Sequence, residues 1–161
     1  GTFEGKKLVF FGEGFNMANS LMLGCAKVGM DVCICAPEGF APRADVVEEA
    51  RKSAHGGAKV VVTSDIEEAI AGANAVYTDV FFSMGQDKDP AKEAALMPMQ
   101  VNAAMMKKAA TDAIFLHCLP AHRGEEVTDE VMEGAQSRIF PEAENRLHAQ
   151  KAVMYMLMKD N

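Results

Sequence analysis

The chain alternates short apolar runs with longer stretches of helical period, and this pattern constrains its fold more than any other feature. The apolar runs are rich in Val, Ile, Phe, Ala or Cys, as strands buried on both faces of a sheet should be. Five runs have the length of a buried strand, and a sixth, shorter run is a further candidate. In chain order, the six runs cover residues 8–12, 31–36, 59–63, 75–79, 113–119 and 138–140.

Helices are predicted between these runs, over residues 16–28, 44–53, 66–71, 98–110 and 142–159. Gly29 is well placed to stop the first helix, and Ser64 or Asp65 to cap the third. Regular alternation of strands and helices is typical of βαβ units. We therefore predict an α/β fold, a three-layer Rossmann-like domain with a mainly parallel sheet of about five strands. Because no linker or repeat interrupts the series, we expect residues 1–161 to form a single domain.

Composition excludes several classes of function. A formal net charge of −7 does not suit the phosphate backbone of nucleic acids. No apolar run approaches the roughly 20 residues that span a bilayer, and the first residues do not form a signal peptide, so we expect a soluble, cytoplasmic protein without a membrane partner. The four cysteines lack CxxC spacing, which favours reduced thiols and argues against a zinc site or other metal.

The first candidate segment, FFGEGFNMANS, joins a strand to a helix. Gly12 and Gly14 permit a tight turn, and a helix N-terminus near Asn16 favours an anion. As a dinucleotide fingerprint the segment is defective, because Met17 takes the place of the third glycine. Three interpretations stay open: a plain turn with Asn16 as N-cap, a dinucleotide site, or a site for a small carboxylate.

The second segment follows the fourth strand, at the edge of the sheet where α/β proteins bind ligands. Asp79 could attract an ammonium group, Ser83 could hydrogen-bond to it, and the amide of Met84 could bind a carboxylate. Together these groups suit a zwitterion. The alternative is a solvated loop.

The third segment ends the fifth strand with His117, Cys118, Leu119 and Pro120. Alternation turns His117 and Cys118 toward opposite faces, and Pro120 ends the strand and permits a cis peptide bond. The alternatives are a buried structural cysteine and a hydrogen-bonded structural histidine. In the fourth segment, FPEAENR, Arg146 is either a solvated helix charge or a contact for an anion or carbonyl.

Taken together and in order, these four segments resemble the second, ornithine-binding domain of ornithine carbamoyltransferases, from near Leu8 to the end of the chain. The resemblance implies transfer of a carbamoyl group from carbamoyl phosphate to L-ornithine, without a metal or organic cofactor. It implies that Asn16 and the Met84 amide bind the carboxylate of ornithine, and that Asp79 and Ser83 bind its α-ammonium group.

The resemblance also implies roles for the segment after the fifth strand. The backbone carbonyls of Cys118 and Leu119 would face the carbamoyl NH2 group, Arg146 would complete the carbamoyl pocket, and His117 and Pro120 would support it. The side-chain amine of ornithine has a lysine-like pKa near ~10.4 and arrives protonated. We expect Asp79, paired with a Cys118 thiolate, to orient this amine and favour its deprotonation, so that Cys118 orients and does not act as a nucleophile.

Two departures from the family pattern limit these expectations. Glu13 and Phe15 replace an aspartate and a first asparagine, so recognition of the carboxylate could differ. The phosphate-gripping Ser-Thr-Arg-Thr-Arg segment of the family's first domain does not occur here, so we expect the chain alone to be inactive and to need that N-terminal domain, in a homotrimer or higher assembly.

Three other functions are weighed against this one. A stand-alone amino-acid-binding module comes second and a dinucleotide-dependent oxidoreductase third. An aspartate carbamoyltransferase is disfavoured because proline is typical at the position of Cys118 in that relative.

Overall fold

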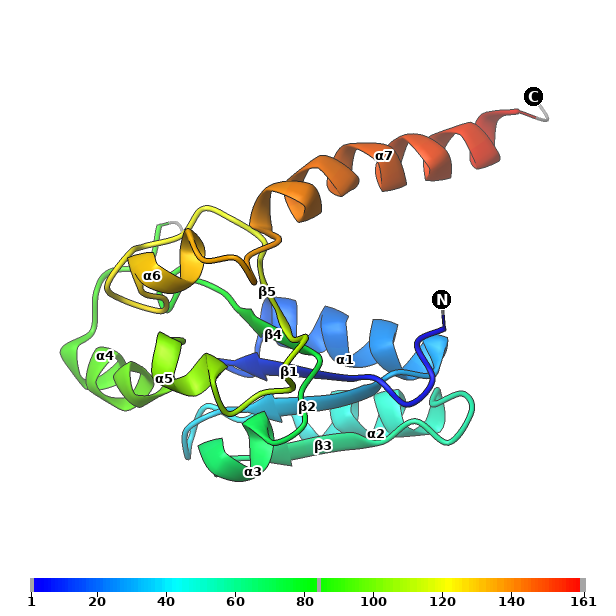
Figure 1. The fold of residues 1–161 in the computed structure, drawn as a ribbon. Coiled ribbons are helices and arrows are strands. Elements are labelled where there is room, and N and C mark those ends of the chain that lie inside the picture. The colour runs from blue at the N-terminus through cyan, green and yellow to red at the C-terminus, as the bar shows by residue number, and fades with distance from the viewer. Residues whose placement is uncertain (1, 84, 160–161) are drawn as a thin grey trace.

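Five parallel strands form the centre of the molecule in a computed structural model that describes residues 2–83 and 85–159 (Figure 1). The strand order is β3-β2-β1-β4-β5. The strands are β1 (Lys7–Phe11), β2 (Asp31–Cys35), β3 (Val60–Thr63), β4 (Ala75–Thr78) and β5 (Ile114–His117). Every pairing is parallel, which confirms the predicted α/β fold and its five-stranded sheet.

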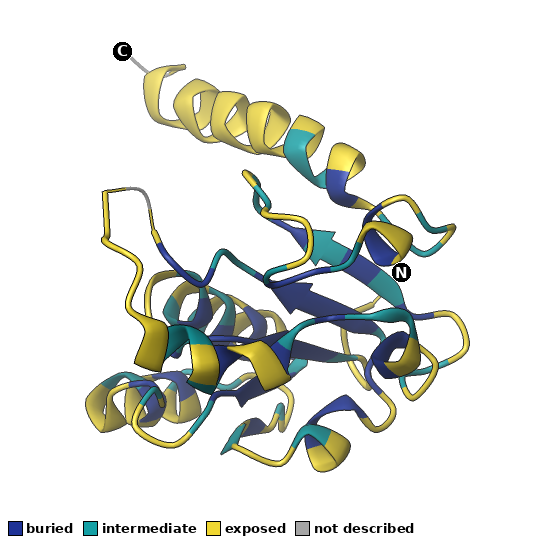
Figure 2. Ribbon diagram, turned by 90° about the vertical axis from the view of Figure 1, so that its left-hand side faces the viewer, coloured by how far each residue is buried: buried dark blue, intermediate teal, exposed yellow. Residues whose placement is uncertain are grey.

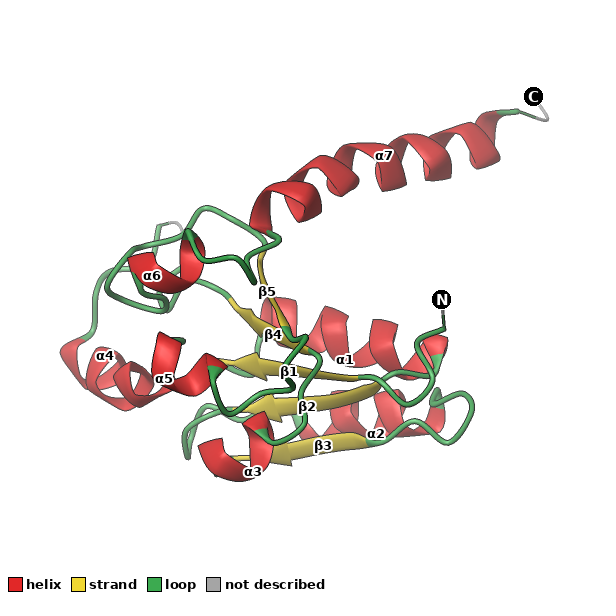
Figure 3. Ribbon diagram, viewed as in Figure 1, coloured by secondary structure: helices red, strands yellow, loops and turns green. Residues whose placement is uncertain are grey.

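Helices cover both faces of the sheet and give the predicted three layers (Figure 3). One face packs against α1 (Asn16–Val28) and α2 (Ala44–Lys52), and the other against α3 (Ile66–Ile70), α5 (Ala103–Met106) and α6 (Asp129–Met132). Successive residues of β1 serve the two cores. Phe10 lies in the core with Met22 of α1, and Phe11 in the core with Met105 of α5, because side chains alternate along a strand.

The order of the strands places a crevice at one edge of the sheet. The chain runs from β1 outward to β2 and β3, then returns to add β4 and β5 on the other side of β1. The connections after β1 and β4 therefore diverge at their carboxyl ends, which is where open α/β sheets bind ligands.

Predicted helix caps are confirmed at two helices. Gly29 ends α1 in the left-handed conformation with φ 80°, and Asp65 accepts hydrogen bonds from the backbone nitrogens of Glu67 and Glu68. Of the interpretations left open for Asn16, that of a helix N-cap is wrong. Phe15 precedes the first helical residue, and no side chain caps this end of α1.

The helix predicted over residues 98–110 is broken into two pieces, a 3-10 turn η1 (Met97–Met99) and α5. Between them Val101 pairs in parallel with Val127, and its nitrogen donates to the carbonyl of Glu126 at 2.9 Å. Asn102 then restarts a helix by accepting a hydrogen bond from the nitrogen of Met105. A long-range pairing thus overrides local helical period.

Three further differences concern short segments. Helix α4 (Pro90–Leu96) is not among the predicted helices, and it begins here because Asp89 caps it and Pro90 suits its first turn. Helix α6 was not predicted. The sixth candidate strand, 138–140, is wrong: Ser137 forms an isolated bridge to Phe115, and the chain then enters α7 (Ile139–Met158).

Helix α7 extends away from the sheet (Figure 1), and its surface is almost entirely exposed (Figure 2). Apart from buried Ile139, its large apolar side chains lie in solvent. They are Phe140, Leu147, Val153, Met154, Tyr155, Met156, Leu157 and Met158. None of the helices in the described residues is long and apolar enough to cross a membrane.

Candidate active site

A pocket of about 680 Å³ opens at the carboxyl ends of β4 and β5, beside the first turn of α1 and the start of α7. Nearly all the predicted site residues line it. These are Asn16, Asp79, Ser83, Cys118, Leu119, Pro120 and Arg146. Met84 lies outside the described residues. His117 is completely buried behind the pocket wall.

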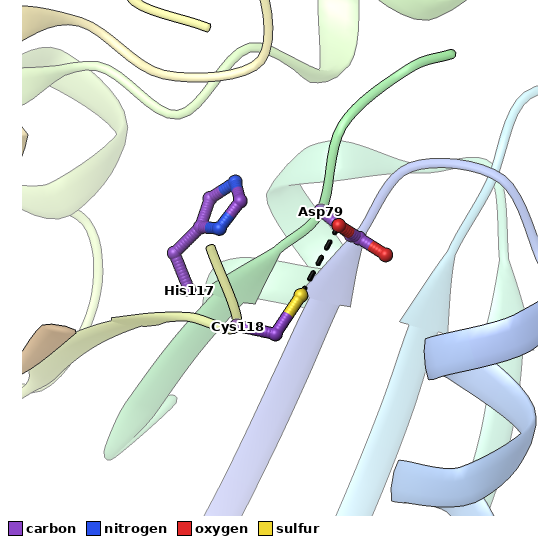
Figure 4. A group of neighbouring side chains, drawn as sticks. All are labelled: Asp79, His117 and Cys118. Atoms are coloured by element: carbon purple, nitrogen blue, oxygen red, sulfur yellow. Dashed lines mark hydrogen bonds between the residues drawn. The ribbon is translucent and has the colours of Figure 1, made fainter. Parts of the chain in front are cut away.

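Asp79 and Cys118 both line this pocket, and their side chains point toward one another (Figure 4). Thr78 pairs with His117 in the sheet, so the next residue on each strand is brought side by side. The Cys118 thiol donates a hydrogen bond from Sγ to Oδ1 of Asp79 at 3.1 Å. The same carboxylate oxygen accepts from the nitrogen of Val80 at 2.8 Å, which fixes its orientation.

The expectation of a thiolate at Cys118 is wrong for this arrangement. Burial, the hydrogen bond to Asp79 and the negative charges of Asp79 and Glu142 together raise the pKa of the Cys118 thiol to about 12, and burial is the largest of these causes. The group is therefore a neutral thiol at physiological pH. It orients the Asp79 carboxylate, and the negative charge in this part of the pocket belongs to carboxylates.

Arg146 reaches the pocket from the second turn of α7. Its Nη1 donates to the backbone carbonyl of Cys118 at 3.0 Å. Of the interpretations left open for this arginine, the structure supports the carbonyl contact over a freely solvated charge.

Glu142 is a site residue that sequence reasoning missed. It lines the pocket one helical turn before Arg146, where it accepts from the Tyr77 hydroxyl at 2.5 Å and from the His117 backbone nitrogen at 2.9 Å. Burial and the hydrogen bond to Glu142 raise the pKa of Tyr77, so its hydroxyl stays a donor. The sequence offered one signal, the four-residue spacing that places Glu142 and Arg146 on one helix face.

Leu119 and Pro120 line the pocket and belong to the segment 118–121, which we call the pocket lip. Their peptide bond is cis, as the sequence permitted, and Leu119 has a positive φ of 57°. The Leu119 nitrogen donates to Nδ1 of His117 at 2.9 Å. His117 is thus a hydrogen-bonded structural histidine whose ring points away from Cys118 (Figure 4).

The space beside the turn after β1 is occupied by residues 40–42 of the chain itself. A Cβ atom added to Gly14 would lie 2.2 Å from the nitrogen of Pro42, and the Gly14 nitrogen donates to the carbonyl of Phe40 at 2.8 Å. In a dinucleotide fingerprint the second glycine lets the backbone approach a pyrophosphate. Here that glycine accommodates the chain between β2 and α2, which argues against a dinucleotide.

Glu13 and Phe15, the two residues of this turn that depart from the family pattern, lie beside the pocket. Glu13 forms a 2.6 Å ion pair with Lys92 of α4, whose ammonium lies 5.4 Å from the ring centre of Phe82. Phe15 is 59% exposed. Neither Glu13 nor Phe15 lines the large pocket, which leaves Asn16 as the residue of this turn that does so, together with Met17.

Metal ligation would disrupt the site's hydrogen bonds. Among the described residues, Asp79, His117 and Cys118 have potential ligand atoms within 4.8 Å of one another. However, both ring nitrogens of His117 are engaged, with the Leu119 nitrogen and with Glu126, and the Cys118 thiol is protonated.

Residues 4–157 match the family model described as the Asp/Orn-binding domain of aspartate/ornithine carbamoyltransferase. The chain belongs to this family. An ornithine carbamoyltransferase of Gloeobacter violaceus is 54% identical over 160 residues, which are 98% of this chain and 51% of the relative. Another, of Rhodococcus opacus, is 52% identical over 161 residues.

Solved structures agree with the family assignment. The ornithine carbamoyltransferase from Pyrococcus furiosus has a TM-score of 0.90 and 44% identity, over 96% of this chain and 50% of that one. The Gloeobacter violaceus enzyme gives a TM-score of 0.85 and 50% identity. The chain thus spans about half the length of these carbamoyltransferases.

Proposed function

We propose that this chain is the ornithine-binding half of an ornithine carbamoyltransferase. The complete enzyme transfers the carbamoyl group of carbamoyl phosphate to L-ornithine and forms L-citrulline and phosphate. The observation that carries this proposal is the Asp79–Cys118 pair, which sits in a pocket with Asn16 and Ser83 in a chain of the carbamoyltransferase family. A carboxylate, an amide and a hydroxyl suit the charges of a free amino acid.

Ornithine would be held at both ends of its zwitterionic group. Asn16 and the Met84 amide bind the carboxylate, and Asp79 and Ser83 bind the α-ammonium group. Asp79 and Glu142 make this part of the pocket electronegative, which attracts a substrate carrying two ammonium groups. The neutral Cys118 thiol keeps Asp79 in place and lies beside the side-chain amine.

The reaction requires that amine in its neutral form. Its nitrogen attacks the carbonyl carbon of carbamoyl phosphate, a C–N bond forms, and the C–O bond to phosphate breaks. The leaving phosphate takes the bonding electron pair and the proton that the nitrogen loses, so charge and atoms balance. The carbonyls of Cys118 and Leu119 accept from the carbamoyl NH2 group. Because a carbonyl oxygen has two lone pairs, that of Cys118 can also keep its hydrogen bond to Arg146.

The phosphate-binding groups would come from the half of the enzyme that this chain does not span. We propose that this N-terminal domain, in a homotrimer or higher assembly, supplies them, that residues 1–161 form a single domain, and that the chain alone is inactive. A cytoplasmic location fits the four free thiols, because reducing compartments keep cysteines unpaired.

An NMR titration of the labelled chain tests the binding site. L-Ornithine is expected to shift the amides of Asn16, Ser83 and Leu119 in a saturable manner, whereas putrescine, L-aspartate and N-acetylornithine are not. Shifts with putrescine or aspartate instead would change the substrate. Joining the chain to the carbamoyl-phosphate half of a relative is expected to produce citrulline, and failure of that well-folded hybrid to do so would contradict the enzyme assignment.

A stand-alone amino-acid-binding module is the second candidate. It is favoured by one observation, namely that Asn16, Asp79 and Ser83 line one pocket within this half. It requires ornithine to bind without carbamoyl phosphate. No response to ornithine alone, followed by a response once carbamoyl phosphate and the second half are present, would exclude the module and support the enzyme.

A further inference from the structure

Glu126 is a completely buried carboxylate in the segment between β5 and α6, and the proposed reaction gives it no task. Its Oε1 lies 2.5 Å from the backbone nitrogen of His122 and 3.3 Å from Nε2 of His117. Its Oε2 is equally buried and has no hydrogen-bond partner among the described residues. A carboxylate is costly to bury with an unpaired oxygen, so its place here needs a physical reason.

The hydrogen bonds of His117 determine where its proton lies. Nδ1 accepts from the Leu119 nitrogen at 2.9 Å, so it carries no proton. A neutral ring then has its proton on Nε2, which faces Oε1 of Glu126. A doubly protonated ring would direct an N–H at the N–H of Leu119. The neutral Nε2–H tautomer is therefore the form that satisfies both neighbours.

One oxygen of Glu126 thus accepts hydrogen bonds on both sides of the pocket lip, which consists of residues 118–121. His117 precedes the segment 118–121 and His122 follows it, and Oε1 accepts from both. Within this segment Leu119 has a φ of 57°. A residue other than glycine rarely adopts this conformation unless its surroundings impose it. The hydrogen bond to His117 supplies that constraint.

We propose that Glu126 is a positioning residue for the substrate pocket. By accepting from Nε2 of His117 and from the nitrogen of His122, it selects the tautomer whose Nδ1 fixes the Leu119 backbone. The lip then presents the Cys118 and Leu119 carbonyls to the pocket. The effect on ornithine and carbamoyl phosphate rests on the proposed function, whereas the hydrogen-bond relay from Glu126 to Leu119 does not.

The relay is tested first without any ligand, by ¹⁵N NMR of the histidine rings in the unmodified chain. His117 is expected to show a protonated, pyrrole-type Nε2 and an unprotonated, pyridine-type Nδ1 at neutral pH. A proton on Nδ1, in either a neutral or a charged ring, would overturn the proposal whatever the chain binds.

Two substitutions of similar volume then distinguish the effect of the hydrogen-bond acceptor of Glu126 from the effect of filling the space with a side chain. Glu126→Gln keeps an oxygen where the His122 nitrogen demands one, so we expect the ring pattern and the Leu119 amide shift to persist. Glu126→Leu removes the acceptor, so both are expected to change. Glu130→Leu, on the exposed side of α6, is the control and should leave both unchanged.

Kinetics of the chain joined to its second half distinguish positioning from general stability. Glu126→Leu is expected to lower kcat about tenfold, while the KM for ornithine changes less than about twofold, because Asn16, Asp79 and Ser83 are untouched. Glu126→Gln should restore kcat to within about twofold. Equal kcat values for the two variants would overturn the proposal. If the leucine variant does not fold, loss of the ring pattern in the glutamine variant would overturn it. Failure of ornithine to bind while the ring pattern is as expected would contradict the proposed function alone.

Discussion

At the scale of single residues, the site depends on a thiol that stays protonated beside a carboxylate. Burial is the largest cause of the raised pKa of Cys118, and the hydrogen bond to Asp79 is the second. The negative charge of Asp79 stabilises the protonated thiol, and the thiol proton in turn satisfies Asp79. Changing either residue should therefore be measurable at the other.

Asp79→Asn is expected to lower the pKa of Cys118 from about 12, although not below its ordinary value of 9.0, because burial remains. A lower pKa means more thiolate at a given alkaline pH and faster alkylation. The measurement is the rate of reaction with iodoacetamide between pH 7 and pH 10. Cys118→Ala gives the background from the three buried cysteines. Identical rate profiles for the wild type and Asp79→Asn would show that the carboxylate does not hold the thiol proton.

Cys35 provides a test of pH-dependent stability in the core. Burial raises the pKa of this thiol from 9.0 to about 12, so the folded state retains a proton that the unfolded chain loses. Its stabilising effect is complete below pH 9 and is lost as the pH rises toward 12. At pH 10 the loss amounts to about 1.4 kcal/mol for such a thiol. Urea unfolding of Cys35→Ala should therefore show a smaller fall in the free energy of unfolding between pH 8 and pH 10 than the wild type, and an equal fall would contradict this account.

Some residues of the site could be predicted from the sequence, and others could not. Asp79 and Cys118 follow strands of a parallel sheet, and such positions converge at one edge of it. Glu142 was missed because its partner Tyr77 is distant in the sequence. Glu126 was missed because the sequence does not show that its side chain is buried. Nothing local to Glu142 indicates that Tyr77, 65 residues earlier, will donate to it.

At the scale of elements, the strands were predictable because their sequences are short apolar runs, and β1, β2 and β4 are indeed buried on both faces. Errors occurred where long-range backbone pairing or capping competes with local pattern. The pairing of Val101 with Val127 divides one expected helix, and Asp89 starts α4 where no helix was expected. The hydrophobic period of a single segment carries no information about such contacts.

The start of α7 is tied to the sheet by the hydrogen bond from Tyr77 to Glu142. Tyr77→Phe would leave a partly buried carboxylate oxygen without its donor. We expect it to lower the free energy of unfolding by about 1–3 kcal/mol and to disturb the Arg146 contact with Cys118. Urea unfolding measures the first effect and the Arg146 side-chain NMR signals the second. Tyr155→Phe, at a position 69% exposed on the same helix, is the matched control and should be neutral. Equal stabilities for the two variants would contradict the anchoring role.

At the scale of the whole molecule, the outer part of α7 carries apolar side chains that no other part of residues 2–83 and 85–159 covers. Leu157 is 72% and Met158 68% exposed. Soluble proteins seldom leave a large, continuous apolar surface exposed. We expect the isolated chain to self-associate as its concentration rises, measured by sedimentation velocity. Replacing both residues with lysine should keep it monomeric, whereas lysine at exposed Glu48 of α2 should have no such effect. A wild-type chain that stays monomeric at high concentration would contradict this expectation.

The return of the chain to place β4 beside β1 also bears on how the protein acquires its activity. Thr78, next to Asp79, donates to the carbonyl of Phe11, 67 residues earlier, so the pocket comes together only after a long loop has closed. A folding intermediate with β1, β2 and β3 in place would already contain much of the helix and sheet, yet it would have nowhere to hold a ligand. Ligand binding is therefore a late and selective marker of the native state, because it reports that the two halves of the sheet have joined.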